Sequence, residues 1–594
     1  MSDPTQTQSS KINFSLVVFV VFLIASITIL IWQVAKPFSQ EVSKTVSDNR
    51  QSIDISIVYA PELDPIMQSA INNFNDTFNT GVNPLNGQKL KDGDKKIKVV
   101  GQSISSGEAR TKIVNSINQS GSKDFTPTIY APTFSGWLSL VNFESGKPIF
   151  DLNNFTSTAK SPVGIAIWEN RLKSIQNKNP NKEIGLAEIQ QVFDSPNGWK
   201  DYDSSINRKQ IYFGFTNPQI SSTAVSALLT QYYSATSPQS EQLSLSEVKS
   251  NQAQKTVQNY QKLIRQYSNN TVVFRDYLGR GPDYIDMLPL AENDLIFVNQ
   301  GKSQNKPPEK LVMLYPKDGS IVHDYPMVIP EADWVSQEQK DAARSFIEYS
   351  LSSDVQQKYL ENGLRPANPN VQLGTPITQE FGVDQNQPKK VLKIPTGEVI
   401  SQIQLNFDFV KKPAKITLLI DTSGSMAGDK IAQAKKALQL FVNKSSAKNE
   451  VGLSSFDSSQ RVLVQPQSLE SSKGQITSGI NELIATGGTA LYDALVQSTE
   501  DFNSSNGQKG VTRAIILLSD GQDTSSSKYK LADVVKKLEE SQKSDSPILV
   551  LPIAYGGDAD LNALNSISRS SKTVVQTGEV KDIEKLLENI SSYF

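Results

Sequence analysis

The stretch Ile416–Met426, ITLLIDTSGSM, gives the clearest indication of the fold of the C-terminal part of the chain. Its first five residues are apolar or β-branched, a pattern that predicts a short buried strand. Beyond it, apolar residues recur at helical spacing, at Ile431, Ala434, Leu438 and Phe441. The polar residues between the two patterns therefore lie where a strand leads into a helix. In an α/β fold that position faces the crevice at the carboxyl ends of the strands, where ligands usually bind.

Two later segments have the same character. TGGTALYDA, residues 486–494, is a glycine turn that opens a helix, and LLSDG, residues 517–521, ends a strand. Their strand–turn–helix context indicates that all three segments lie at one edge of the sheet. Asp421, Ser423 and Ser425 offer hard oxygen atoms, which suit Mg²⁺ or Ca²⁺ rather than zinc or copper. The alternative is that all three are ordinary turns, in which Asp, Ser and Gly are common.

Strand and helix patterns alternate through the rest of this region, so we expect a mostly parallel sheet covered on both faces. The predicted strands are 416–420, 450–456, 511–519, 547–556 and 573–577. The predicted helices are 430–443, 472–485, 490–503, 528–543 and 581–591.

On these motifs, residues 413–594 resemble the von Willebrand factor type A family, whose fold is a Rossmann-like doubly wound α/β domain. The family's metal-ion-dependent adhesion site is D-x-S-x-S, a later Thr and a later Asp, which match Asp421, Ser423, Ser425, Thr489 and Asp520. The resemblance implies Mg²⁺ at this site, with Mn²⁺ or Ca²⁺ as alternatives. It also implies a protein partner whose acidic side chain completes the metal shell. The sequence shows no nucleophile–base pair and no Walker-type loop, so we expect no enzyme and no catalytic residues.

The composition of the chain excludes or disfavours several kinds of partner and site. The chain has 594 residues and a formal net charge of −2, which argues against a nucleic-acid partner. It contains no Cys, so disulfides and thiolate metal sites are excluded. Its one histidine, His323, makes a Ser-His-Asp triad improbable, and we interpret it as structural or merely exposed.

The N-terminus carries a long apolar run. Residues 12–35, with LVVFVVFLIASITILIW at their centre, approach the length of about 20 residues that spans a bilayer. A cleaved signal peptide is the alternative, but its apolar core is typically shorter and QVAKPF is a poor cleavage site. We therefore expect residues 1–11 to form a cytoplasmic tail and residues 12–35 to form an uncleaved transmembrane anchor. Lys11 and Lys36 flank the run on opposite sides and leave its orientation open.

Residues 52–370 repeat one theme, in which a strand ends in small or hydroxylated residues that begin a helix. IDISIVYAP, PTIYAPTFSGW and IYFGFTNPQISSTAVSAL are examples. Such turns present free backbone N–H groups and favour anions. For a single turn the simpler explanation is that Ser and Thr are preferred helix N-caps. Several such turns in one α/β domain predict a ligand cleft.

This region resembles bacterial solute-binding proteins of the two-lobed, type II periplasmic-binding architecture. The resemblance rests on these segments together with SPVGIAIW, YPKDGSIVHDYP, WVSQEQKDAARSFIEYSLS and GLRPANPNV. It implies a cleft between lobes for a small-molecule solute, with PVGIAIW and YPMVIP as strands that cross between them. Candidate cleft residues, chosen by turn position, are Ala60, Ser105, Ser106, Thr133, Ser135, Ser221, Ser222, Thr223 and Tyr284.

Residues 371–412 form the boundary between the two domains. After Pro395 the apolar residues approach helical spacing and Thr396 is a candidate N-cap, which predicts a connecting helix; a flexible tether is the alternative. Together, the resemblances imply a bacterial binding protein anchored in the cell membrane, with most of the chain periplasmic or on the cell surface. The alternative is a solute receptor of an ABC-type transport system, with the type A domain as its docking module.

Overall fold

The computed structural model describes residues 50–118, 125–206, 208–238, 241–269, 271–504, 510–544 and 546–594. The anchor predicted at residues 12–35 lies outside these ranges. Among the described helices, none combines the length and the apolar character needed to cross a bilayer. Contacts divide the chain into a small unit that includes Asn73–Lys98 and a large unit of Asp54–Asn72 with Val99–Phe594.

The described part of the small unit centres on a loop between a helix and a strand. Within this loop Val82 and Lys89 form an isolated antiparallel bridge. The Asn83 N–H donates to the Gln88 carbonyl over 2.8 Å. The rings of Phe74 and Phe78 meet edge to face with centroids 5.1 Å apart, so the end of the helix contributes a small aromatic core.

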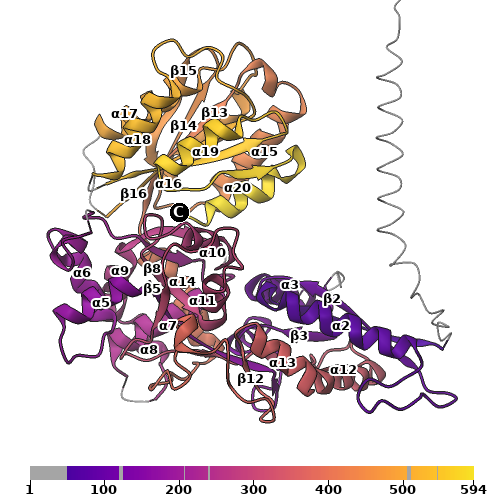
Figure 1. Ribbon diagram of the computed structural model, residues 1–594. Helices are drawn as coiled ribbons and strands as arrows, with labels where there is room; N and C mark the ends of the chain where they lie inside the picture. The colour runs from indigo at the N-terminus through magenta and orange to yellow at the C-terminus, as the bar shows by residue number, and fades with distance from the viewer. Residues whose placement is uncertain are drawn as a thin grey trace, which may run out of the picture. The chain divides into compact units, whose positions relative to one another are not determined.

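What we call the first lobe is a sheet of strand order β2-β1-β3, in which β1 and β3 are parallel (Figure 1). Its strands are β1 (Ser52–Tyr59), β2 (Lys96–Ser103) and β3 (Ile129–Ala131). Its helices are α2 (Asp64–Asn79), α3 (Ser106–Asn118), α4 (Gly136–Ser145), α12 (Gln337–Ser350) and α13 (Ser353–Glu361). The late helices return to this lobe, since the Gln339 amide donates to the Asp54 carbonyl and Lys358 bonds to Ser69.

The second lobe is built on a mixed sheet of order β10-β5-β8-β6-β7, to which β9 and β12 add by pairing with β5. Its strands are β5 (Ala159–Trp168), β6 (Phe213–Thr216), β7 (Ile264–Ser268), β8 (Met287–Ala291), β9 (Leu311–Leu314), β10 (Val322–His323) and β12 (Arg365–Pro366). Its helices are α5 (Glu169–Lys178), α6 (Leu186–Asp194), α7 (Ser222–Thr236), α8 (Leu245–Lys249), α9 (Asn251–Lys262), α10 (Thr271–Gly279) and α11 (Glu292–Asn299).

The chain crosses between the lobes near residue 325. His323 pairs with Ser161 of β5 in the second lobe. Five residues later, Val328 forms an antiparallel bridge with Tyr130 of the first lobe. Between them, β11 (Pro326–Met327) pairs with β4 (Thr156–Ser157). The segment YPMVIP, residues 325–330, therefore crosses between the lobes as expected. PVGIAIW, residues 162–168, does not cross, because it lies within β5 and pairs with β8 and β9 of the second lobe.

A single helix, α14 (Gly397–Val410), packs against both lobes and then leads into the C-terminal domain. Thr396 caps its N-terminus by accepting from the Val399 N–H. Ile400 and Ile403 are fully buried, and the Gln404 amide donates to the Pro218 carbonyl of the second lobe over 2.6 Å. Phe407 stacks on Phe215.

The C-terminal domain is a six-stranded sheet of order β15-β14-β13-β16-β17-β18. The strands are β13 (Ala414–Asp421), β14 (Glu450–Phe456), β15 (Gln460–Ser468), β16 (Thr512–Ser519), β17 (Ile548–Tyr555) and β18 (Gln576–Gly578). The helices are α15 (Asp429–Lys444), α16 (Leu469–Glu482), α17 (Leu491–Ser504), α18 (Leu531–Gln542), α19 (Leu561–Ser570) and α20 (Ile583–Ser591). All strand pairs are parallel except β14 with β15.

Both faces of this sheet are buried, which explains its continuous apolar strands. On β13, Leu418 and Ile420 share one core with Ala434 and Leu438 of α15. The intervening Leu419 belongs to a second core, with residues of α17, α18 and α19. The sequence patterns predicted neither β15 nor α19. The β15 strand lies at an edge and its side chains are largely exposed, so it carries little apolar signal.

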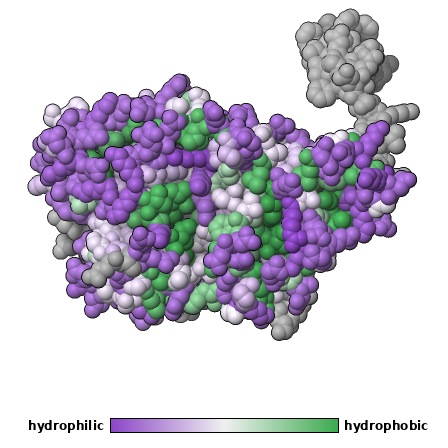
Figure 2. Space-filling view, turned by 90° about the horizontal axis from the view of Figure 1, so that it is seen from below, coloured by the Kyte–Doolittle hydropathy of each residue, from purple (hydrophilic) through white to green (hydrophobic). Residues whose placement is uncertain are grey.

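The molecular surface carries both apolar and hydrophilic residues. In Figure 2, seen from below, apolar residues gather near the middle of the face and hydrophilic residues border them. Exposed apolar side chains are normal on folded proteins, so this mixture needs no functional explanation.

Candidate functional site

The predicted metal-site residues lie at the carboxyl edge of the C-terminal sheet. β13 and β16 are parallel neighbours, with Ile420 opposite Leu518, so Asp421 at the end of β13 and Asp520 just after β16 lie at adjacent strand ends. β14 and β16 flank β13 on opposite sides, and the sheet is therefore wound in two directions from this point. Such a switch point leaves a crevice at the strand ends.

The first segment is held by its own hydrogen bonds. Asp421 Oδ1 accepts from the Ser423 N–H over 2.9 Å, and Asp421 Oδ2 accepts from Ser519 Oγ over 2.6 Å. Gly424–Met426 form a single 3₁₀ turn, which brings the two serine hydroxyls within 3.0 Å of each other. Ser425 Oγ then donates to Asp520 Oδ1 over 2.8 Å. The turn thus joins both strand ends through side chains.

The segment around Thr489 is fastened to the same turn. The Thr486 N–H donates to the Thr422 carbonyl over 2.7 Å, and the Gly424 N–H donates to the Gly487 carbonyl over 3.0 Å. A Cβ placed on Gly521 would lie 3.6 Å from Ser425 Oγ and 4.0 Å from Thr489 Oγ1. Both hydroxyls therefore approach the same backbone position. The structure brings together all five residues predicted for the metal site.

The charge at this site is concentrated and buried. Asp421 and Asp520 are both 0% exposed. Burial raises the pKa of the Asp421 carboxyl, and the nearby Asp520 carboxylate raises it further, against hydrogen bonds from Ser423 and Ser519 that lower it. The Lys430 ammonium forms an ion pair with Asp520 Oδ2 and lies 3.8 Å from Asp558 Oδ2.

Sequence reasoning missed Lys430 and Ser519 as members of this site. Lys430 belongs to the first turn of α15, and the Tyr555 hydroxyl fixes that turn by donating to the Lys430 carbonyl over 2.9 Å. Its position in the sequence could have identified it, because Lys430 follows the D-x-S-x-S segment by five residues and lies in the first turn of the helix that this segment leads into. Ser519 is the last residue of β16 and directly precedes Asp520. Its sequence position predicts only a buried strand residue.

Several of the proposed solute residues meet where the two lobes touch. The Thr133 N–H donates to Ser106 Oγ over 3.2 Å within the first lobe. Thr133 Oγ1 bonds directly to Ser222 Oγ of the second lobe, which also accepts from Trp137 Nε1 over 2.7 Å. The Gly107 N–H donates to the Ile220 carbonyl over 3.2 Å. Hydroxyls expected to face a solute therefore bond to one another across the lobes.

The other proposed solute residues are placed differently. Ser221 Oγ caps α7 and lies 2.8 Å from Thr216 Oγ1, and Thr223 is buried in the same helix. Ser135 donates its N–H to Asp324 over 2.7 Å. Ala60 and Ser105 serve helix starts through their carbonyls, which accept from Leu63 and Ala109.

Tyr284 lies apart from this group. Its ring meets Tyr277 edge to face with centroids 6.2 Å apart, and Lys572 Nζ of the C-terminal domain lies 5.5 Å from its ring centroid. The structure therefore places Tyr284 beside the C-terminal domain and not among the interlobe hydroxyls.

The fold and the two sites define a class of protein made of two α/β binding domains. Comparison with family profiles names both. Residues 415–590 match the von Willebrand factor type A domain, and residues 91–383 match the bacterial extracellular solute-binding proteins. The chain therefore carries a solute-binding-protein domain fused to a von Willebrand factor type A domain.

Each of the following relatives matches one part of the chain. Inter-alpha-trypsin inhibitor heavy chain H2 of Homo sapiens is 25% identical over 171 residues, which are 28% of this chain and 18% of that protein. The structure of a von Willebrand factor type A protein from Catenulispora acidiphila is 20% identical, covers 31% of this chain and 42% of its own, and has a TM-score of 0.27. The periplasmic binding protein AfuA from Actinobacillus pleuropneumoniae, solved with fructose-6-phosphate, is 14% identical and covers 60% of this chain and 98% of its own, with a TM-score of 0.41.

Proposed function

We propose that the type A domain binds Mg²⁺ through Asp421, Ser423, Ser425, Thr489 and Asp520, and through the metal binds an acidic residue of a protein partner. The supporting observation is that side-chain hydrogen bonds join Ser423, Ser425 and Asp520, while Asp421 and Thr489 lie on the adjoining strand end and turn. Mg²⁺ prefers such hard oxygen ligands and keeps some of its waters. Mn²⁺ and Ca²⁺ share this preference and are the alternatives.

The donor set fits a divalent cation. Two carboxylates stand here without exposure to water, a costly arrangement unless cations balance them. Across the described residues, no group of three or more His, Asp or Glu side chains is gathered that could hold a metal. The proposed site has two carboxylates, and its remaining oxygens are hydroxyls.

The net charge of the site supports an acidic partner. Asp421 and Asp520, once ionised, would balance one dication, and the Lys430 ammonium beside them adds one positive charge. The loaded site would thus carry a net charge of +1 from these groups. A carboxylate of a partner could then occupy an open position on the metal and be attracted by Lys430 as well.

Direct metal titration tests the first step. The full-length chain, purified with EDTA and then freed of it, is titrated with Mg²⁺ by calorimetry and with Mn²⁺ by electron paramagnetic resonance. We expect one site in the wild type and none in Asp421→Asn or Ser423→Ala. The control Asp533→Asn also removes a carboxylate, but from the exposed start of α18, and should bind as the wild type. Equal binding by all variants would refute the site.

Capture from membranes tests the partner. Wild-type chain should retain a partner with Mg²⁺ present and lose it in EDTA, whereas Asp421→Asn should retain none in either condition. Capture that is the same in all conditions would remove the metal bridge from the proposal, even if the metal titration succeeded.

We propose further that the first domain binds a small solute between its lobes and that residues 12–35 anchor the chain in the cell membrane. The interlobe bonds of Thr133 and Ser222 support the first point, because a solute with hydroxyl or carboxylate groups could replace them. Anchoring predicts that the full-length chain stays in carbonate-washed membranes. Recovery in the wash would refute it.

A further inference from the structure

A small cavity lies where β7 of the second lobe, the linker before β13 and the start of β16 meet. Its volume is about 50 Å³, and it is lined by Arg265, Lys412, Gly510, Val511, Thr512, Arg513, Ser546, Pro547 and Leu549. Three of these residues are cations, and of the described residues that line the cavity none is acidic. Such an excess of buried positive charge is unfavourable unless an anion compensates it.

Arg265 is the most deeply placed of the three cations. It is 9% exposed, and its guanidinium stacks on the Tyr212 ring at 3.7 Å from the centroid. Its Nη2 donates to Gln542 Oε1, whereas Nε and Nη1 have no hydrogen-bond partner among the described residues. Burial, and the nearby Arg208 charge, lower the pKa of the Arg265 guanidinium.

Asp286, the carboxylate whose charge acts on Arg265, is already paired with other cations. Arg208 covers the Tyr212 ring at 3.9 Å from the centroid and donates to Asp286 Oδ1 over 2.7 Å. Arg171 donates to the same oxygen over 3.2 Å. The single negative charge of Asp286 is therefore shared by two other guanidinium groups and leaves Arg265 uncompensated.

The remaining donors come from the start of β16 and from the linker. Arg513 is buried, and its Nη1 and Nη2 donate to the carbonyls of Phe502 and Ser546 respectively. Its Nε has no partner among the described residues, and the same is true of Thr512 Oγ1. Lys412 is half-buried, and burial together with the charge of Arg265 lowers its pKa to about 8.

We propose that this cavity binds a small tetrahedral oxyanion of the phosphate or sulfate class. The unpartnered N–H groups of Arg265 and Arg513, the Thr512 hydroxyl and the Lys412 ammonium supply donors from several sides. A volume of about 50 Å³ has room for about three or four waters or one such anion. Waters could satisfy the N–H groups, but they would leave the charge uncompensated.

The bound anion would join the two domains. Arg265 belongs to the solute-binding-protein domain, whereas Thr512 and Arg513 belong to the type A domain and Lys412 lies between them. The anion would thus strengthen the contact through which α14 leads into β13. This function is independent of the metal site, which lies at the opposite, carboxyl end of β13 and β16.

The test uses inorganic phosphate and sulfate on the full-length chain in detergent, at constant ionic strength set with chloride and with EDTA present so that no metal-bound phosphate contributes. Calorimetry and thermal unfolding are measured together. We expect saturable binding and a rise in melting temperature with both oxyanions. A response no larger than that to chloride would overturn the proposal.

Two variants at one position keep the test specific. The Lys412 side chain makes no hydrogen bond to the described residues. Lys412→Gln should therefore weaken phosphate binding by at least about tenfold. Lys412→Glu places a tethered carboxylate beside the cavity and should abolish the phosphate response without lowering the melting temperature. Lys436→Gln removes the same charge from the exposed face of α15 and should bind phosphate as the wild type. Wild-type affinity in Lys412→Gln would overturn the proposal.

Discussion

Ser425 Oγ donates a hydrogen bond to Asp520 Oδ1 over 2.8 Å, although 95 residues separate them in the chain. The contact exists because β13 and β16 are adjacent and parallel, so that the turn after one strand lies beside the end of the other. It joins two of the three segments that carry the proposed metal ligands.

Lys430 competes with a metal for Asp520, since its ammonium forms an ion pair with Asp520 Oδ2. Lys430→Met should therefore bind Mg²⁺ at least about tenfold more tightly, because two unit charges about 4 Å apart interact by several kcal/mol near a protein surface. It should bind an acidic partner more weakly. Lys430→Arg keeps the charge and serves as the control. Calorimetry measures both affinities, and weaker Mg²⁺ binding by Lys430→Met would show that Lys430 positions Asp520 instead.

His323 should remain neutral through physiological pH. It is the chain's one histidine, and burial lowers its pKa to about 3, with Nε2 at 3.0 Å from Ser226 Oγ. An unfolded chain binds this proton near pH 6.5 and the folded chain does not, so stability is lost as the pH falls from 6.5 toward 3. The loss amounts to at most about 1.4 kcal/mol per pH unit from this group.

Isotope-labelled histidine gives one resonance whose titration can be followed without assignment. We expect no transition between pH 5 and 8. His323→Gln should flatten the fall in stability between pH 6.5 and 5 in urea unfolding. A resonance that titrates near pH 6.5 would contradict the buried, neutral state.

Gly397 allows α14 to approach α4 closely. A Cβ at this position would lie 2.2 Å from the Ser139 carbonyl oxygen, which is backbone and cannot swing away. Gly397→Ala should therefore lower the free energy of unfolding by about 1–3 kcal/mol. Gly474→Ala is the matched control, since Gly474 lies within α16 and a Cβ there meets nothing within 4 Å. That control should be neutral or stabilising by up to about 1 kcal/mol.

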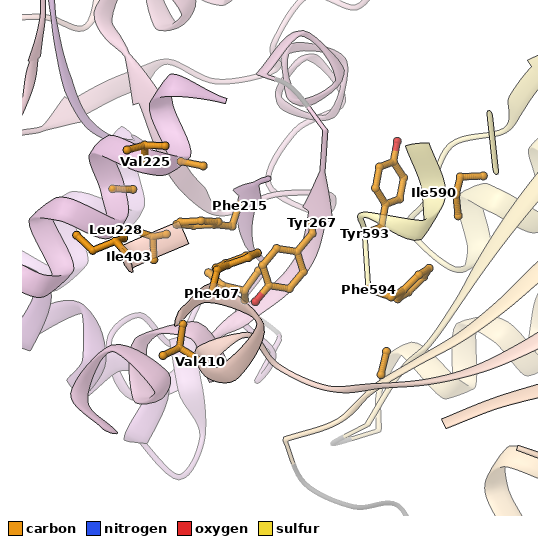
Figure 3. Close-up of a cluster of buried hydrophobic side chains, with 14 of the residues drawn as sticks. Phe215, Val225, Leu228, Tyr267, Ile403, Phe407, Val410, Ile590, Tyr593 and Phe594 are labelled. Atoms are coloured by element: carbon orange, nitrogen blue, oxygen red, sulfur yellow. The ribbon is translucent and has the colours of Figure 1, made fainter. Parts of the chain in front are cut away.

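Phe407 links α14 to the second lobe. It is 4% exposed, and its ring lies 6.2 Å from that of Phe215 and 6.1 Å from that of Tyr267. Figure 3 shows it beside both rings, with Ile590, Tyr593 and Phe594 of the C-terminal segment in the same cluster. Phe407→Ala should cost about 3–5 kcal/mol of stability.

Phe409, two residues further along the same helix, supplies the comparison. It is 48% exposed, so Phe409→Ala should change the melting temperature little. Thermal unfolding of Phe407→Ala and Phe409→Ala measures the two changes in melting temperature. Equal changes would mean that α14 is not buried as the structure shows.

Local patterns predicted much of the type A domain. The strands at 416–420 and 450–456 and the helix at 430–443 lie within β13, β14 and α15, because a sheet covered on both faces requires continuous apolar runs. Edge strand β15 lacked that signal. The five proposed ligands could be named in advance because they match the D-x-S-x-S, Thr and Asp pattern of the type A family, and local patterns place each of them at a strand end or helix start.

What the sequence determined by itself was therefore local: which segments form strands and helices, and which polar residues stand at their ends. Tertiary structure alone decided the rest. It placed Lys430 on Asp520, turned the hydroxyls of Thr133 and Ser222 toward each other, and brought Arg265 to the cavity that Arg513 also lines. Periodicity along the chain reports only which side of an element is buried. The partners of a buried charge come from distant segments, and only packing of the whole domain selects them.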